Sequence, residues 1–257
     1  MKHGWHIAPG KQESDIFPMG KKIRLATLIL IALCPQFLKR LLYRGLFGYK
    51  IGRGVKIGLS LIDARKCVIG DDVTIGHFNL IVDVGSISIG ENTRIGTLNV
   101  IRGGEEVDIG RFCEIIRLNE INSIPDPIVS NPVDQRFILG SGSVITASHK
   151  IDFTDKVQFG ERVILGGRNS SLWTHSRQST LPISIGRQTY VGSEVRFAPG
   201  SVIGQRCVVG IGSVVTKAFS EEGGVIAGVP ARWIKEISPE DTALIDFKTR
   251  PDLPDDI

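Results

Sequence analysis

The chain has 257 residues, of which 42% are hydrophobic, so it can bury a sizeable core in one large domain or two small ones. Its formal net charge of +4 is too small to indicate a nucleic-acid-binding protein. The cysteines are scattered singly, which argues against a CxxC metal site or a disulfide framework and favours a reducing compartment. They are Cys34, Cys67, Cys113 and Cys207.

Residues 21–50 are basic and apolar, and we expect this segment to be helical. Between Asp15 and Asp63 the sequence has nine cations and no acidic residue. The apolar run 25–34 rises only about 15 Å as a helix, roughly half of a bilayer core, before Pro35 interrupts it. We therefore expect neither a membrane span nor a cleaved signal peptide. Two hypotheses stay open: the segment contacts an anionic membrane surface, or it packs across the first repeat.

From residue 51 the chain repeats an apolar residue every six positions. The step is unbroken through Ile185, Val191, Phe197, Ile203, Val209 and Val215, and Ile-Gly pairs show the same step earlier. Six is not a helical period, but it is even, so in an extended chain these side chains share one face. Short strands joined by turns at a fixed length predict a solenoid of stacked coils.

Three irregular stretches interrupt the repeat. Residues 119–137 are polar and contain Pro125, Pro127 and Pro132, which predicts a surface loop projecting toward a substrate or partner. The second interruption lies before residue 185 and contains His175. A third irregular stretch, "ITASHKIDF", contains His149.

The repeat ends in "GSVVTK", residues 212–217, followed by "GVPAR", residues 228–232. The pattern [LIV]-G-x-x-x-x together with these two elements resembles the hexapeptide-repeat acyltransferases over roughly residues 51–237. The resemblance implies an all-β fold, a left-handed parallel β-helix. We expect an N-terminal extension over 1–50, the β-helix with inserted loops over 51–219, and a C-terminal cap and tail over 220–257.

The same resemblance implies a cosubstrate and an assembly. The family's acyl-CoA end corresponds here to the cap, and the positions carried over as cofactor contacts are Ser193, Thr216, Lys217 and Arg232. Cations suit the phosphates of acetyl-CoA. The family's active sites lie between neighbouring chains of a homotrimer. An alternative for this segment is that it only covers the exposed strand edges at the end of the solenoid.

Two histidines are candidates for catalysis. In the family's sugar acetyltransferases a histidine lies in a loop shortly before the repeat resumes, and "THSRQSTLPISIG" resembles that arrangement. A neutral sugar hydroxyl needs a base when it attacks a thioester, which favours His175. His149 stays open as the base itself, as its helper, or as a residue that orients the acceptor. The expected acceptor contacts are Asn169, Trp173 and Arg177.

The sequence therefore predicts a CoA-dependent O-acetyltransferase. Its expected acceptor is a sugar hydroxyl in a surface polysaccharide, a lipopolysaccharide or a lipid-linked glycan. We expect a cytoplasmic protein, with peripheral contact at the inner face of the membrane through residues 21–50, and we expect no resident metal and no nucleic-acid partner. Two alternatives remain: a zinc enzyme of the same fold, similar to carbonic anhydrases, and a non-enzymatic scaffold.

Overall fold

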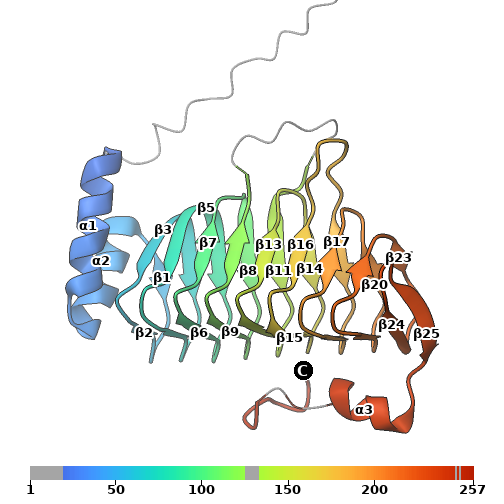
Figure 1. Ribbon diagram of the computed structural model, residues 1–257. Helices are drawn as coiled ribbons and strands as arrows, with labels where there is room; N and C mark the ends of the chain where they lie inside the picture. The colour runs from blue at the N-terminus through green and yellow to red at the C-terminus, as the bar shows by residue number, and fades with distance from the viewer. Residues whose placement is uncertain (1–19, 125–132, 247, 249) are drawn as a thin grey trace, which may run out of the picture.

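The computed structural model describes residues 20–124, 133–246, 248 and 250–257. Its body is a solenoid in which each strand pairs in parallel with the equivalent strand of the next coil (Figure 1). Each regular coil contributes three strands, so the strands form three rows along the solenoid. The predicted parallel β-helix is confirmed.

The strand bounds follow the three rows. The first row contains β1 (Lys50–Ile51), β8 (Glu106–Ile109), β11 (Arg136–Leu139), β14 (Val157–Phe159), β17 (Ile183–Ile185), β20 (Val202–Ile203) and β23 (Ala218–Phe219). The third row contains β7 (Val100–Arg102), β10 (Glu120–Asn122), β13 (Lys150–Asp152), β16 (Ser171–Trp173), β19 (Arg196–Phe197) and β22 (Val214–Val215). Two long strands run from the third row into the first, namely β3 (Leu61–Ile69) and β5 (Leu80–Ile89).

The second row forms a separate sheet. Its members are β2 (Lys56–Ile57), β4 (Thr74–Ile75), β6 (Arg94–Thr97), β9 (Glu114–Arg117), β12 (Val144–Ala147), β15 (Ile164–Arg168), β18 (Tyr190–Val191), β21 (Val208–Val209), β24 (Gly224–Ala227) and the antiparallel β25 (Arg232–Glu236). The repeat residues of this row point inward and are at most 1% exposed from Ile57 to Val209. This stack of aliphatic side chains is the core that the six-residue period predicts.

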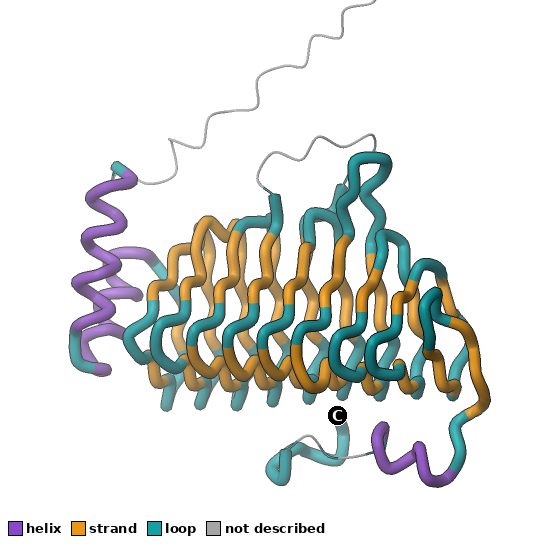
Figure 2. Tube along the Cα trace, in the orientation of Figure 1, coloured by secondary structure: helices purple, strands orange, loops and turns teal. Residues whose placement is uncertain are grey.

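The third row continues the six-residue step and the irregularities follow it. Ile81, Ile101, Ile121 and Ile151 pair in register, each six residues after the preceding core residue of its coil. The extra residues then come between the third row and the first, along one edge of the solenoid (Figure 2). The expectation of a loop over the whole of 119–137 was wrong at both ends, because Asn119 is buried, β10 follows it, and β11 begins at Arg136. The three prolines of that stretch lie outside the described residues.

A buried polar ladder runs along the corner between the second and third rows. Each member's side chain accepts a hydrogen bond from the backbone N–H of the next member, so backbone amides that turn away from the strands keep partners. The members are Ser60, Asn79, Asn99, Asn119, His149 and Ser170. From Asn79 on, each member follows a residue with positive φ, namely Phe78, Leu98, Leu118, Ser148 and Asn169.

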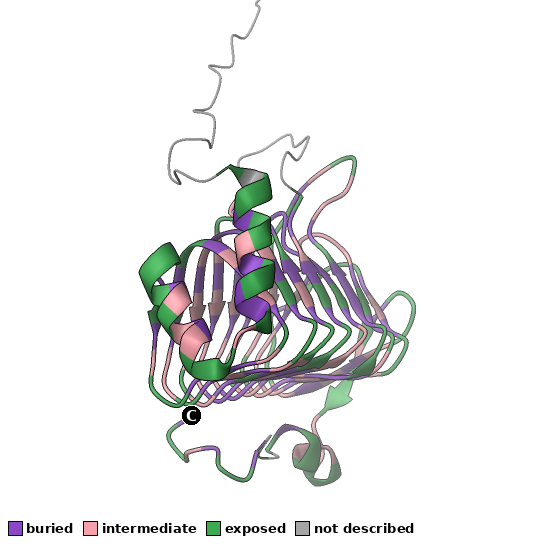
Figure 3. Cartoon of the chain, turned by 90° about the vertical axis from the view of Figure 1, so that its left-hand side faces the viewer, coloured by how far each residue is buried: buried purple, intermediate pink, exposed green. Residues whose placement is uncertain are grey.

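Two helices close the open end of the first coil (Figure 3). They are α1 (Lys21–Leu33) and α2 (Gln36–Phe47). Tyr43 and Phe47 are buried and each ring lies 5.5 Å from the Tyr49 ring of the first coil. The segment therefore packs across the first coil, as one of the two hypotheses predicts. None of the described helices combines the length and the hydropathy that a bilayer crossing requires.

The C-terminal tail returns along the outside of the solenoid after α3 (Pro239–Ile245) (Figure 1). Leu253 and Ile257 form a small buried cluster with Phe112. Arg250 is 3% exposed, donates a hydrogen bond to the carbonyl of Asn92, and pairs with the Asp252 carboxylate. The tail thus ties late residues to early coils, which the sequence pattern did not predict.

We expect Arg250→Ala to destabilise the folded protein by about 2 kcal/mol, because it removes a buried side chain, its hydrogen bond to the partly buried carbonyl of Asn92 and its ion pair with Asp252. Exposed Arg187, for which no side-chain hydrogen bond or ion pair is found among the described residues, supplies the matched control Arg187→Ala. Thermal unfolding followed by circular dichroism measures both variants. Equal melting temperatures for the two variants would show that the tail does not stabilise the coils.

Candidate active site

His175 lies in a short hairpin that leaves the solenoid after β16. Its backbone forms an antiparallel bridge with Thr180, and its Nδ1 lies 3.0 Å from Thr180 Oγ1. The imidazole is half-buried. For Nε2 no hydrogen-bond partner is found among the described residues, so one ring nitrogen is held while the other is available. This is the geometry of an oriented base.

A buried carboxylate fixes the hairpin to the coil. Asp152 accepts hydrogen bonds from the backbone N–H of His175 (3.0 Å) and from the backbone N–H and hydroxyl of Thr154 (3.0 and 2.6 Å). Asp152 therefore orients the main chain at His175 and not its ring. Sequence reasoning did not assign this role to Asp152, and it missed Thr180, whose only signal was its position five residues after His175 in the same break.

The expected acceptor residues are only partly brought together. Trp173 and His175 are two residues apart around the buried Thr174, so they share the outer side of the chain. Trp173 is 46% exposed and Arg177 at the hairpin tip is exposed as well. Asn169 lies at the other end of β16, up to roughly 20 Å along the chain from His175. The structure does not bring Asn169 to the histidine.

His149 belongs to the buried ladder and not to an open loop. It is 0% exposed, its Nδ1 accepts a hydrogen bond from the Ser170 N–H (3.1 Å), and its Nε2 lies 3.0 Å from Thr146 Oγ1. The Thr146 hydroxyl is within reach of the carbonyls of Leu165 and Gly167, so it donates there and accepts from Nε2–H. Burial lowers the pKa of His149 to about 4. The ring is thus neutral and fully engaged, which favours a structural role over the three catalytic roles left open by the sequence.

Three of the four expected cofactor residues share one hollow. This hollow lies at the end of the solenoid and has a volume of about 520 Å³. It is lined by Thr216, Lys217 and Arg232, together with Phe219, Glu221 and Trp233. Lys217 Nζ lies 5.1 Å from the centre of the Phe219 ring. The two aromatic rings and the two cations of this hollow suit a ligand that carries both a ring system and phosphates. Ser193 lies at a different corner and does not line the hollow.

The hollow and His175 stand on the same corner of the solenoid. Leu172 of β16 pairs with Phe197 of β19, which pairs with Val215 of β22. Continuing this register by two residues makes Thr174 and Lys217 equivalent positions two coils apart, or about 10 Å. His175 and the cationic hollow are therefore aligned along the edge that also carries the extra residues of the irregular coils.

Metal ligands form no comparable group. Over residues 20–124 and 133–246 no three His, Cys, Asp or Glu side chains are close enough to hold a metal ion. One of the three imidazoles that a zinc enzyme would require, His149, has both ring nitrogens engaged within its own chain.

No protein-family model matches the chain. Sequence relatives are found nonetheless: the galactoside O-acetyltransferase of Escherichia coli is 31% identical over 113 residues, which are 42% of this chain and 55% of that protein. The putative lipopolysaccharide biosynthesis O-acetyl transferase WbbJ of Escherichia coli is 43% identical over 58 residues, 23% of this chain and 29% of that protein. The chain resembles acetyltransferases in sequence. This confirms the resemblance inferred from the repeat and the cap.

The chain spans about half the length of the galactoside O-acetyltransferase, and less of WbbJ. Among solved structures, the UDP-N-acetylglucosamine acyltransferase of Campylobacter jejuni has a TM-score of 0.47 at 15% identity, covering 76% of this chain and 78% of that chain. The polySia-specific acetyltransferase NeuO has a TM-score of 0.40 at 19% identity, covering 73% of this chain and 81% of that chain.

Proposed function

We propose that the protein transfers an acetyl group from acetyl-CoA to a sugar hydroxyl. The observation that carries this proposal is the alignment of His175, with its available Nε2, and the Lys217–Arg232 hollow along one corner of the solenoid. The sequence relatives that are named acetyltransferases support it. Because the chain covers only part of those relatives, the acceptor is proposed from the chemistry of the site.

His175 acts as the general base in this proposal. Nδ1 carries the ring proton and donates it in a hydrogen bond to Thr180 Oγ1, so the lone pair of Nε2 faces outward. Nε2 takes the proton of the acceptor hydroxyl as its oxygen attacks the thioester carbonyl. When the tetrahedral intermediate collapses, the C–S bond breaks and the imidazolium returns the proton to the departing thiolate. The acetyl ester and the free thiol of CoA are the products, without a covalent enzyme intermediate.

The exposed Trp173 supplies an apolar face beside the base. A sugar ring presents C–H groups on one side, which pack on an indole, and Arg177 at the hairpin tip adds hydrogen-bond donors for its hydroxyls. These two residues form the acceptor side of the proposed site. Asn169 and Ser193 lie at a different corner of the solenoid from His175. They can contact a reaction centre only if the His175 of that centre belongs to a neighbouring chain. This supports the proposal of a homotrimer with sites between neighbouring chains.

The cationic hollow predicts a selective loss of cosubstrate binding. We expect Lys217→Ala to raise the KM for acetyl-CoA by roughly tenfold, because one charge-assisted contact to a phosphate is lost, with little change in kcat. Steady-state kinetics with the exposed Lys66→Ala as control measures the effect. A fall in kcat at unchanged KM would place Lys217 in the chemical step and contradict its role in binding.

Release of the CoA thiol in the presence of a panel of glycans tests the reaction itself. Mass spectrometry of the glycan then identifies the acetylated hydroxyl. We expect acetyl-CoA to raise the melting temperature as well, because a ligand that binds only the folded state stabilises it. Thermal stabilisation by acetyl-CoA without transfer to any glycan would indicate that the protein binds CoA but uses another kind of acceptor. An absence of both effects would favour a scaffold. Because acetyl-CoA is made and used inside cells, we place the reaction on the cytoplasmic side.

A further inference from the structure

The helix pair that closes the first coil has an outer surface that is mostly apolar. The inner side of α1 packs on the core through Leu28 and Ile31. Its outer side and the outer side of α2 expose large aliphatic and aromatic side chains, from 46% for Ile29 to 71% for Phe37. This apolar cap surface consists of Ile23, Leu25, Ile29, Leu30, Leu33, Phe37, Leu41 and Leu46. Such a concentration on two adjacent helices is unusual for a surface that stays in water.

Cations are concentrated in the same stretch of chain as the apolar cap surface, and no acidic residue lies between Gly20 and Asp63. Two of the nine cations serve the fold, because Arg24 pairs with Asp63 and the buried Lys39 donates to the carbonyls of Ile57 and Gly58. Six further cations of this segment are exposed or half-buried, and we call them the basic rim. They are Lys22, Arg40, Arg44, Lys50, Arg53 and Lys56. Of these, Arg53 pairs with Asp71 on the surface and Arg44 donates to the carbonyl of Ile51.

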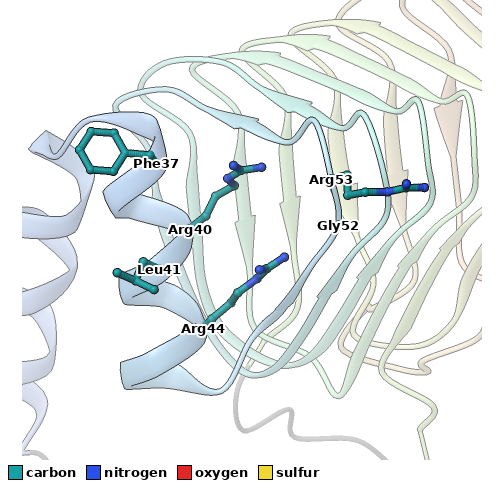
Figure 4. A pocket seen from close by; sticks show the side chains of 6 residues that line it. All are labelled: Phe37, Arg40, Leu41, Arg44, Gly52 and Arg53. Atoms are coloured by element: carbon teal, nitrogen blue, oxygen red, sulfur yellow. The ribbon is translucent and has the colours of Figure 1, made fainter.

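A hollow of about 430 Å³ lies at the edge of the apolar cap surface. Phe37 and Leu41 line it from α2, and Arg40 and Arg44 extend from the same helix toward the first coil, which carries Arg53 (Figure 4). The site therefore combines apolar side chains with three guanidinium groups. Guanidinium groups bind phosphate oxygens through paired hydrogen bonds.

We propose that this end of the solenoid docks onto the surface of an anionic membrane. The apolar cap surface enters the boundary between headgroups and acyl chains, and the cations of the basic rim meet lipid phosphates, as in other interfacial amphipathic helices. A second copy of the chain fits the same surface less well. A symmetric contact between two caps would bring like-charged rims together, whereas an anionic bilayer is complementary in both apolar character and charge.

Docking at this end sets the height of the proposed site. From β3 to β16 the third row makes five steps between coils, so His175 stands about 24 Å above the first coil along the solenoid. With α1 and α2 lying across the end of the solenoid, the reacting sugar hydroxyl would be held well away from the lipid phosphates (Figure 1). A glycan of several sugars on a lipid reaches that height, and a single sugar next to its lipid phosphate does not. This acceptor preference rests on the proposed acetyl transfer, while membrane docking does not.

Vesicle flotation with the full chain tests the docking. We expect binding to vesicles of phosphatidylcholine mixed with phosphatidylglycerol, and much weaker binding to phosphatidylcholine alone. The double variants Leu30→Glu with Phe37→Glu, and Lys22→Glu with Arg40→Glu, should each reduce partitioning by roughly tenfold or more. All four side chains project from the surface or lie partly in it, so the fold should persist, which circular dichroism checks.

The control is Leu244→Glu with Arg187→Glu, which makes the same kinds of change away from the cap and should leave partitioning unchanged. Wild-type binding by both cap variants, or no binding by the unaltered chain, would overturn the proposal. If the unaltered chain ignores vesicles and Leu30→Glu with Phe37→Glu lowers its mass in light scattering, the surface is an interface between copies. Acetyl transfer to a soluble glycan should be equal in all these variants, so loss of docking is distinguishable from failure of the proposed reaction.

Discussion

Replacement of His175 by alanine is expected to lower kcat/KM for acetyl transfer by a factor of roughly 10² to 10⁴, the usual contribution of a general base. The loss should appear mainly in kcat, because the ring touches the reacting hydroxyl and not the CoA phosphates. The folded protein should be little affected, since the half-buried ring lies in a hairpin whose attachment to the coil uses the backbone N–H of His175 and the Asp152 carboxylate. Steady-state rates of thiol release at saturating acetyl-CoA measure the effect.

The matched control is His77→Ala, which removes an exposed imidazole from a regular coil. Like His175, His77 has one ring nitrogen in a hydrogen bond, because its Nδ1 accepts from the Leu59 N–H. The variant therefore measures the effect of removing an imidazole that lies outside the proposed site. We expect its activity to stay near that of the unaltered chain. Full activity in His175→Ala would remove the residue from the mechanism. Equal losses in both histidine variants would indicate a general effect on the fold.

The repeat made the fold predictable because its physical cause is local. An even period with an inward apolar residue leaves a stacked solenoid as the way to bury those residues, and the core from Ile57 to Val209 follows that rule. The cap residues Thr216, Lys217 and Arg232 were predictable from the family resemblance, and they converge because all three lie within one short segment at the end of the coils. The hairpin of His175 was foreseen as a break in the period.

Long-range features were not predictable from that period. The tail residue Arg250 reaches the carbonyl of Asn92, 158 positions away, through contacts that leave no periodic trace. The ladder is a second case. It mixes serine, asparagine and histidine at coil spacings of 19 to 30 residues, so the sequence shows His149 only as a polar residue between two repeats. An irregular pattern around a histidine thus arose from a buried corner and not from an open site.

The ladder makes His149 the second residue with a large expected effect, this time on stability. We expect His149→Ala to destabilise the protein by about 3 kcal/mol, because the Ser170 N–H loses its acceptor in a buried corner and a cavity forms. His149→Asn should recover much of this loss, since the three preceding coils carry asparagine at the same position and its Oδ1 can accept from the next amide. Thermal unfolding of the two variants measures the difference.

The activity and the pH dependence of His149→Asn separate a ladder residue from a base. Burial lowers the folded pKa of His149 from 6.5 to about 4, so between these values the unfolded chain binds a proton that the folded chain does not. Stability therefore rises with pH through this window, by about 3 kcal/mol in total, and is lost as the pH falls. His149→Asn should lack this contribution while keeping acetyl transfer. A stable but inactive His149→Asn would instead return His149 to the reaction as the base or as its helper, because the hydrogen bonds of the ladder would then be intact while the chemistry had failed.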